Sequence, residues 1–442
     1  MPLFRDIPTP DATASQADCI EWAARRDPIG HRVHLSMAMI ALFCIPLASS
    51  PATVSSTILF GYTLLRAPTL WRTWRALPSA PVMIATLLVF VWLGMSTSWS
   101  SDAQQGIRLL RGSRYLLLIP ALVPLLAHRD LLLRALTAGI LFQCGAQYVE
   151  YLVDGNHGLG GLSEHPGHTC LWYSLALGYL AFSPSPRTHR WGFRVPLFVI
   201  IILGAVLTAA RSAFAGLIGG LLVAVVVGNP LRRRGASLAV VAGGLLAVAG
   251  IASTTHIGDR IVNAWEGMTT PYEGGVFDIE GNRITWWKIG LQEWTDHPVL
   301  GTGIGSAGRI IANDPHIQYI VSESPENKHV IRDDFHSTFI TMLTESGAVG
   351  LLLLCAWMIL LACTITGNRN WRLVLITGYV TWIAYCVLNT TLFSGRLVAF
   401  PSTLLALSLV PEIAGDIGLR SALGVRETNS STEPTGSSST DD

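Results

Sequence analysis

Hydrophobic positions along the chain gather into long apolar runs, which are separated by short polar connections and by one long polar stretch from about Ser253 to Ser337. Most runs approach the length of about 20 residues that an α-helix needs to cross a bilayer. The pattern predicts an all-α polytopic membrane protein with about twelve transmembrane helices. The runs lie at 34–49, 53–67, 81–98, 115–127, 131–151, 168–183, 195–210, 213–228, 237–252, 346–366, 373–392 and 398–411.

The same pattern divides the chain into five regions. The last of them is Ser/Thr-rich and acidic, a composition typical of disorder. The regions are an N-terminal arm (1–33), nine apolar helices (34–252), a large polar loop (253–345), three further helices (346–411) and a tail (412–442).

Composition supports the membrane class. Half of the residues are hydrophobic and 13% are charged, against roughly 25% charged in soluble domains. Most arginines fall in alternate connections, so the positive-inside rule places both termini in the cytoplasm and the large loop outside. Residues 1–30 lack an apolar core, which argues against a cleavable signal peptide. The seven cysteines lie in the arm or in apolar runs, so we expect buried thiols rather than disulfides.

Several arginines break the charge rule, because they fall in outer connections that should be poor in basic residues. Arg108, Arg111 and Arg114 precede the fourth run, and Arg396 precedes the last. Arg211 lies between two apolar runs, where an unpaired charge is costly and usually functional. An anionic ligand at the outer face would explain these arginines, and contact with lipid headgroups is the alternative.

The large loop contains a first helix signal. Asn282 is a suitable N-cap, and Pro298 ends the pattern. Arg283 then falls in the first turn, where free backbone N–H groups favour an anion such as a diphosphate. The alternative is a solvated arginine beside Glu280. The expected apolar stripe consists of Ile284, Trp287, Leu291 and Trp294.

A second helix signal covers residues 333–345, with Asp334 as its cap and with Gly347 and Gly350 marking a bend into the next apolar run. His336 falls in the first turn. Because a helix N-terminus disfavours imidazolium, His336 should be neutral and able to accept a proton near pH 7. Taken alone, a first-turn histidine is more often a cap or a surface residue.

Between these signals, Gly303, Gly305 and Gly308 match the pattern GxGxxG. No strand precedes them and no βαβ unit surrounds them, so a dinucleotide site is excluded. Glycines of this kind also allow backbones to approach closely, and we expect a turn packed near a glycan or another loop.

A metal site is a further alternative. Glu164, His165 and His168, with His157 nearby, have a spacing that resembles a metal motif. Zinc motifs place two histidines on one helix face, and Pro166 should break a helix here. Ordinary loop histidines are the favoured interpretation, and we expect no metal, no cofactor and no nucleic-acid partner.

In order and spacing, these motifs resemble the O-antigen ligase family, over about Thr208 to Gly350. They are Arg211-Ser212, Arg283 to Trp287, His297-Pro-Val-Leu-Gly-x-Gly-x-Gly, Asp333 to Ser337 and Glu345-x-Gly347. No single motif is specific, but their combination is.

The resemblance implies a C-type membrane glycosyltransferase in the bacterial inner membrane, with its active site on the periplasmic side. Such ligases transfer O-polysaccharide from undecaprenyl diphosphate to a sugar hydroxyl of lipid A-core, without metal or nucleotide. By motif match, His336 is the general base, and Arg211 and Arg283 bind the diphosphate. Arg108, Arg111, Arg114 and Arg396 are further candidates for substrate binding.

Three alternatives stay open at the level of sequence. An O-antigen polymerase and a protein O-oligosaccharyltransferase would use the same donor. A transporter of lipid-linked glycan would place ionisable residues near the bilayer midplane. Most charges here lie at the ends of the apolar runs, which favours the enzyme.

Overall fold

The computed structural model describes residues 16–228 and 279–409, apart from 76, 78–79, 155–159, 164, 184–190, 209, 324–327, 329–330, 367 and 393–394. Within these residues every regular element is a helix. The expected all-α class is confirmed for this part of the chain. The predicted run at 237–252, residues 253–278 of the large loop and the tail at 412–442 lie outside the described residues.

Helices occupy the predicted runs wherever the chain is described. Before the large loop they are α1 (Gln16–Arg26), α2 (Pro28–Cys44), α3 (Ser49–Leu65), α4 (Ala67–Leu70), α5 (Pro81–Ser96), η1 (Thr97–Trp99), α6 (Ala103–Leu110), η2 (Arg111–Leu117), α7 (Leu118–Leu122), η3 (Val123–His128), α8 (Arg129–Asp154), α9 (Pro166–Phe182), α10 (Trp191–Leu207) and α11 (Arg211–Gly228). From the loop onward they are α14 (Ile279–Asp296), α15 (Ala307–Asn313), α16 (Pro315–Glu323), α17 (Thr338–Thr364), α18 (Arg369–Leu388) and α19 (Gly395–Ser408).

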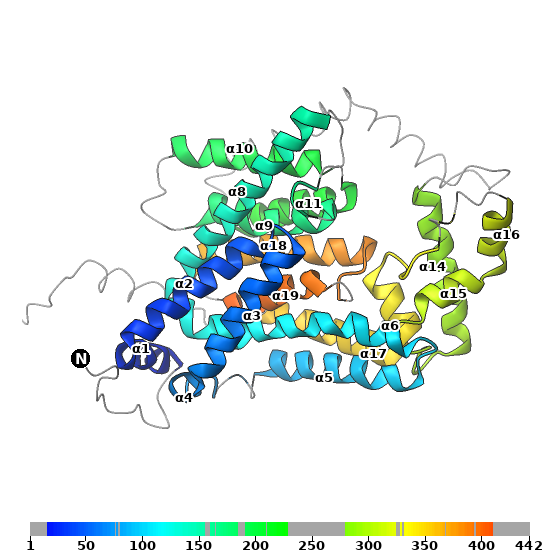
Figure 1. Cartoon of the computed structure of the whole chain (residues 1–442), viewed down its shortest axis with the longest axis horizontal. Coiled ribbons are helices and arrows are strands. Elements are labelled where there is room, and N and C mark those ends of the chain that lie inside the picture. The colour runs from blue at the N-terminus through cyan, green and yellow to red at the C-terminus, as the bar shows by residue number, and fades with distance from the viewer. Residues whose placement is uncertain are drawn as a thin grey trace, which may run out of the picture.

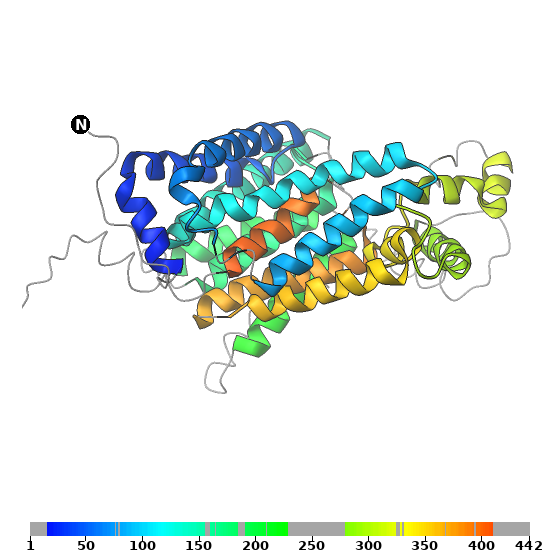
Figure 2. The ribbon, with the colours of Figure 1, turned by 90° about the horizontal axis from the view of Figure 1, so that it is seen from below.

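The described helices form an elongated bundle. The loop helices α14, α15 and α16 lie at one end, and α1 and α4 lie at the other (Figures 1 and 2). Within the bundle, α11 packs against α18, α18 against α9, and α17 against α5. One large hydrophobic core extends through these helices, because most of their inward side chains are apolar.

Within the described part of the chain, four helical stretches are long and apolar enough to span a membrane, which makes this a multi-pass membrane protein. They are Pro81–Trp99, Ala103–Val153, Thr338–Thr364 and Arg369–Leu388, and shorter apolar helices cover Phe193–Leu207, Ser212–Gly228 and Arg396–Ser408. The helical turns from Ala103 to Val153 are continuous, although the sequence predicted an outer connection before residue 115 and a break near residue 129. The count of twelve stays a prediction.

The bend expected at the start of the tenth run is confirmed. Gly347 has φ 68° and ψ −172° inside α17, a conformation that favours glycine. A Cβ at Gly347 would also lie 2.1 Å from the carbonyl oxygen of Val299. The kink therefore lets the segment after α14 pack directly on the backbone of α17.

The loop helices have a small core of their own, formed by Trp286, Ile289, Ala307, Ile311, Ile317, Ile320 and Phe335. The stripe predicted for α14 was wrong, because Trp286 and Ile289 are buried while Leu291 is 40% exposed. Apolar residues occur on more than one face of α14, so sequence spacing alone does not select the face that packs.

All seven cysteines are free, and Cys19, Cys144, Cys170 and Cys386 are buried. The expected absence of a disulfide framework among them agrees with these positions. Buried thiols here behave as small hydrophobic groups within helix contacts.

Candidate active site

His336 lies in the loop that leads from α16 into α17, at the end of the bundle where α14 packs. It is the only non-glycine with a positive φ (50°) among the described residues. Backbone conformations of this kind cluster at functional sites, because the surrounding structure must hold them in place. The imidazole packs on Trp286 of α14, with ring centroids 4.9 Å apart, and its side chain is 29% exposed.

The loop around His336 is fixed on both sides. Asp334 Oδ1 accepts a hydrogen bond from the backbone N–H of His336 at 2.7 Å. Trp287 Nε1 donates to the carbonyl oxygen of Phe335 at 3.0 Å, and the Phe335 ring is fully buried. These contacts hold the backbone of His336 against α14.

The predicted helix start at Asp334 was wrong. α17 begins at Thr338, and Ser337 is its N-cap, whose side chain accepts from the N–H of Ile340. Asp334 instead bonds to the backbone of His336, an aspartate turn that competes with helix formation. His336 therefore precedes the helix and does not lie in its first turn.

The charge state of His336 follows from burial. Desolvation lowers the pKa of His336 below its ordinary value, and the charges of Arg283 and Arg332 lower it further. The Asp334 carboxylate opposes them, with its Oδ1 3.6 Å from His336 Nδ1. A neutral imidazole near pH 7 was expected, and the direction agrees, although burial rather than a helix terminus is the main cause.

Arg283 lies on α14, one helical turn before Trp286. The expectation that it occupies the first turn was wrong, because α14 begins at Ile279 rather than after Asn282. The free N–H groups of the helix terminus thus lie one turn earlier. Arg283 is half-buried, and its charge acts on His336.

Arg211 is the first residue of α11, as expected for a turn between two apolar runs, and its side chain lies outside the described atoms. The next residue, Ser212, links α11 to the loop that contains His336. Asn389 Nδ2 donates to Ser212 Oγ at 2.9 Å, and the carbonyl oxygen of Asn389 accepts from the backbone N–H of Thr338 at 3.1 Å. The start of α11 is therefore joined through Asn389 to a residue two positions after His336.

Other helix ends meet in the same region. A Cβ at Gly167, near the start of α9, would lie 2.8 Å from the Tyr385 hydroxyl of α18 and 3.6 Å from Ala210. Arg396, at the start of α19, lies close enough for its charge to act on His168 of α9. The ends of α9, α11, α18 and α19 thus meet beside the histidine loop.

Sequence reasoning did not identify Trp286, Arg332, Tyr385 or Asn389. Trp286 and Arg332 are near His336 along the sequence, so a wider search around the histidine would have found them. Tyr385 and Asn389 follow an apolar run, and no local pattern distinguishes them. Their place depends on the packing of α18 against α9 and α11.

Arg108, Arg111 and Arg114 lie on exposed positions of α6 and η2. Arg108 Nη1 contacts Gln105, and Arg114 Nη2 donates to Thr53 Oγ1 of α3 at 3.0 Å. None of the hydrogen bonds found in the described part of the chain joins them to His336. Their role in substrate binding stays a prediction.

The prediction that Pro166 breaks any helix between His165 and His168 was wrong. Pro166 is the first residue of α9 and His165 is its N-cap, since proline is well tolerated at the start of a helix. The two imidazole rings lie 4.7 Å apart. Among the described residues, no group of three or more histidine, cysteine or acidic side chains is placed to hold a metal. Glu164 and His157 lie outside the described residues.

The glycine-rich segment after α14 forms the close backbone approach predicted for it. Gly301, Gly303 and Gly305 all have positive φ. A Cβ at Gly303 would lie 2.3 Å from Ser100 Cα, and one at Gly305 would lie 2.4 Å from the backbone nitrogen of Gly106. The segment is therefore packed against the turn between α5 and α6.

Glu345 holds the other side of this segment. Its carboxyl group is fully buried, and Oε1 accepts from the N–H groups of Gly305 and Ala307 at 3.0 and 2.9 Å. The carbonyl oxygen of Glu345 also accepts from Gly303 N–H at 2.8 Å. The motifs around residues 303 and 345 therefore form one structural unit beneath the loop helices.

In chemical terms, the site combines an uncharged imidazole, two nearby guanidinium groups and a carboxylate. An imidazole of this kind can accept a proton from a hydroxyl group. Guanidinium groups can stabilise negative charge on a phosphate oxygen. This combination suits group transfer from a phosphate leaving group to a hydroxyl acceptor.

Residues 196–355 match the sequence model of the O-antigen ligase family. The matched region extends from α10 into α17 and contains Arg211, Arg283 and His336. Among curated proteins, none matches the chain.

Proposed function

We propose that this multi-pass membrane protein, which carries an O-antigen ligase domain at residues 196–355, transfers O-polysaccharide from undecaprenyl diphosphate to a sugar hydroxyl of lipid A-core. The transfer occurs at the periplasmic side of the inner membrane in lipopolysaccharide biosynthesis. It requires no metal ion and inverts the configuration at the anomeric carbon.

In this reaction the acceptor hydroxyl oxygen attacks the anomeric carbon as the bond from that carbon to the diphosphate oxygen breaks. His336 accepts the hydroxyl proton, and the diphosphate leaves with the bonding electron pair. Arg211 and Arg283 stabilise the charge on the departing diphosphate, which divalent metals do in many nucleotide-sugar enzymes. Asp334, whose Oδ1 lies 3.6 Å from His336 Nδ1, stabilises the imidazolium once it forms.

The observation that carries the proposal is the environment of His336. A half-buried imidazole is held in a left-handed backbone against Trp286, and its pKa is lowered by burial and by Arg283 and Arg332. A surface histidine would need neither the strained backbone nor the surrounding charges. Both features are typical of a general base.

The test is transfer in vitro, with purified protein in lipid nanodiscs, undecaprenyl-diphosphate-linked polysaccharide and lipid A-core, in the presence of a chelator. We expect His336→Ala to lower the rate by about 10²- to 10⁴-fold, the usual contribution of a general base. His316→Ala, an exposed histidine on α16, is the matched control and should leave the rate unchanged. Full activity of His336→Ala, or a strict need for a divalent ion, contradicts the mechanism.

The same assay identifies the acceptor substrate. Lipid A-core, a second lipid-linked glycan and a peptide acceptor are supplied separately to the wild-type protein. Transfer to lipid A-core alone supports the ligase, whereas transfer to the second glycan identifies a polymerase. Retained anomeric configuration in the product contradicts a single displacement.

A further inference from the structure

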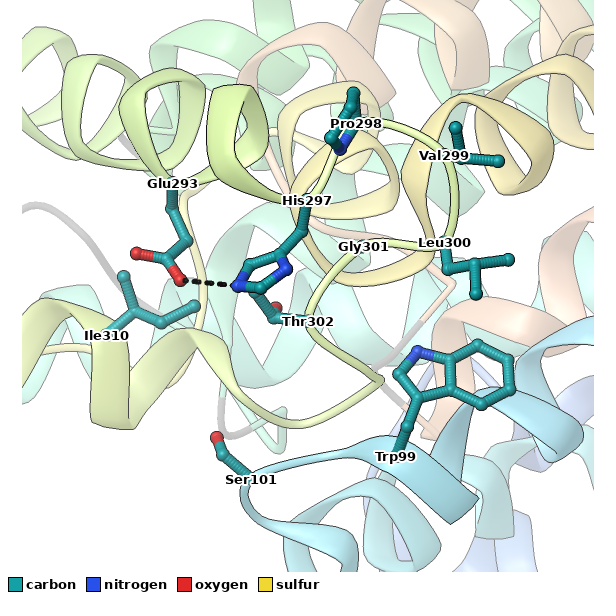
Figure 3. Close-up of a pocket in the computed structure, with 10 residues that line it drawn as sticks. All are labelled: Trp99, Ser101, Glu293, His297, Pro298, Val299, Leu300, Gly301, Thr302 and Ile310. Atoms are coloured by element: carbon teal, nitrogen blue, oxygen red, sulfur yellow. Dashed lines mark ion pairs between the residues drawn. The ribbon is translucent and has the colours of Figure 1, made fainter.

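A pocket of about 600 Å³ lies at the far end of α14, separate from His336 (Figure 3). Glu293 and His297 come from the end of α14, Leu300 and Thr302 from the glycine-rich segment, and Trp99 and Ser101 from the turn after α5. In Figure 3 the Trp99 indole lies below the glycine-rich segment. The side chains of Glu293 and His297 face each other to the upper left of the indole. The pocket thus joins three segments that are far apart in sequence.

The walls of this pocket are held rigidly. Trp99 packs edge-on against Trp92 of α5, with ring centroids 5.8 Å apart. Arg309 of α15 donates a hydrogen bond to the carbonyl oxygen of Ser101, which fastens the loop helices to the turn after α5. The glycine contacts described above fix the segment between them. A pocket with braced walls needs little reorganisation when it binds a ligand.

Its polar groups keep free hydrogen-bonding capacity. Glu293 Oε1 and His297 Nε2 lie 3.9 Å apart, which is too far for a hydrogen bond, and their side chains are 33% and 55% exposed. A carboxylate accepts hydrogen bonds from hydroxyl groups, and an imidazole can donate or accept one. Both groups are therefore available to a ligand in the pocket.

The lining selects against a phosphate. No lysine or arginine is among the described residues that line the pocket, and Glu293 would repel an anion. An indole, a carboxylate, an imidazole and a serine together suit a sugar ring, which has an apolar face of C–H groups and an edge of hydroxyl groups.

Position relates the pocket to the proposed active site. Trp286, which packs on His336, and Glu293 are seven residues apart on α14, so they lie on the same face about 10 Å from each other along the axis. Val299 and Leu300 line this pocket and are exposed, and the Val299 backbone contacts α17 next to its kink, beside the ends of two membrane-length helices. The pocket therefore lies next to a surface that suits the membrane boundary.

We propose that this pocket is a saccharide subsite that binds sugar residues of a membrane-anchored glycan substrate while another part of that substrate is at His336. The identity of the glycan rests on the proposed function. The same chemistry is offered by the sugars of lipid A-core and by those of the lipid-linked donor.

Binding is tested without turnover, in the His336→Ala background in nanodiscs, with three probes: lipid A-core, lipid A lacking core sugars, and the lipid-linked polysaccharide. We expect Trp99→Ala with Glu293→Gln to weaken binding of one of the two glycan probes by roughly 10-fold, because a stacking contact is lost and a charged hydrogen-bond acceptor becomes neutral. Binding of lipid A without core sugars should not change.

The two sources give different results. Weaker binding of lipid A-core identifies the acceptor as the occupant, and weaker binding of the polysaccharide probe identifies the donor. Trp71→Ala, an exposed tryptophan at the opposite end of the molecule, and Gln292→Ala, an exposed neighbour on α14, are the controls. Unchanged affinity for both glycan probes overturns the subsite.

The binding measurement needs no catalysis. It can therefore contradict the subsite without contradicting the proposed function, and the transfer assay can do the reverse. An inactive wild-type protein that still binds a glycan through Trp99 and Glu293 contradicts the transfer reaction alone. If the enzyme is active but its affinity for both glycan probes is unchanged by Trp99→Ala and Glu293→Gln, the subsite alone is contradicted. A thermal unfolding curve of each variant shows that the fold is retained.

Discussion

At the scale of single residues, His336 shows how much depends on surroundings that sequence does not reveal. Its motif could be located in the sequence, and a neutral imidazole could be anticipated. The cause was misassigned, since burial against Trp286 and the charges of Arg283 and Arg332 lower its pKa. Burial against α14 and the charges on α14 and in the histidine's own loop together determine the electrostatics of this residue.

The pH dependence of transfer should follow from these charges. A general base is active when deprotonated, so activity is present above the pKa of His336 and is lost as the pH falls through it. Since the pKa is lowered, the acidic limb of kcat/KM should lie below 6.5, the ordinary value for histidine. The measurement is kcat/KM for the acceptor, with the lipid donor held at saturation, over a range of pH.

Two substitutions should move this limb in opposite directions. Asp334→Asn removes a charge that raises the pKa of His336, so the limb moves to lower pH, while the amide oxygen can still accept the His336 N–H. Arg332→Gln removes a charge that lowers the pKa, so the limb moves to higher pH. Arg369→Gln, an exposed position at the start of α18, is the control and should cause no shift. Shifts in the same direction would show that the limb does not report His336.

At the scale of elements, the glycine-rich segment is the best example of a successful sequence interpretation. The pattern of Gly303 and Gly305 was assigned to close backbone approach rather than to a nucleotide site, and the structure confirms it. The partner of that approach, the turn between α5 and α6, lies about two hundred residues away in sequence. No local signal identifies such a partner.

Gly303→Ala should destabilise the protein. The new Cβ would lie 2.3 Å from Ser100 Cα, and alanine would also have to adopt φ 89°. Strained backbone of this kind costs roughly 1–3 kcal/mol before the steric clash is added. We expect a lower thermal midpoint in detergent and reduced transfer. Gly145→Ala is the matched control, because a Cβ at Gly145 of α8 meets nothing within 4 Å, and its midpoint should not fall.

At the scale of the whole molecule, the loop helices α14, α15 and α16 gather at the end of the bundle opposite α1 and α4 (Figure 1). This separation agrees with the expectation from arginine distribution that the N-terminal arm and the large loop face opposite sides of the membrane. The orientation itself stays a prediction.

The two lysines of the chain allow this orientation to be tested. Lys288 on α14 and Lys328 are both exposed and both belong to the large loop. A membrane-impermeant amine reagent applied to intact spheroplasts should therefore label both lysines. The Lys288→Arg, Lys328→Arg double variant should lose this signal, and cytoplasmic proteins serve as a control for leakage. Labelling of these lysines only after lysis would place the loop in the cytoplasm.

By itself the sequence determined the helical class, the described helices that occupy the apolar runs and the segments that carry Arg211, Arg283 and His336. It did not predict the helices α1, α4, α6, α15 and α16. Apolar runs of bilayer length and the polar connections between them are local properties of a chain, so they can be recognised without coordinates. Local signals also predicted the kink at Gly347, although the cap of α17 was placed at Asp334 instead of Ser337.

Only the tertiary structure decided which of these segments meet. Asn389 joins the start of α11 to the start of α17, Trp286 supports the imidazole, and Trp99 lines a pocket with Glu293. Each contact joins residues from separate segments of the chain. Helix packing is selected by the fit of whole surfaces, and single-sequence patterns do not encode which of several apolar faces will fit.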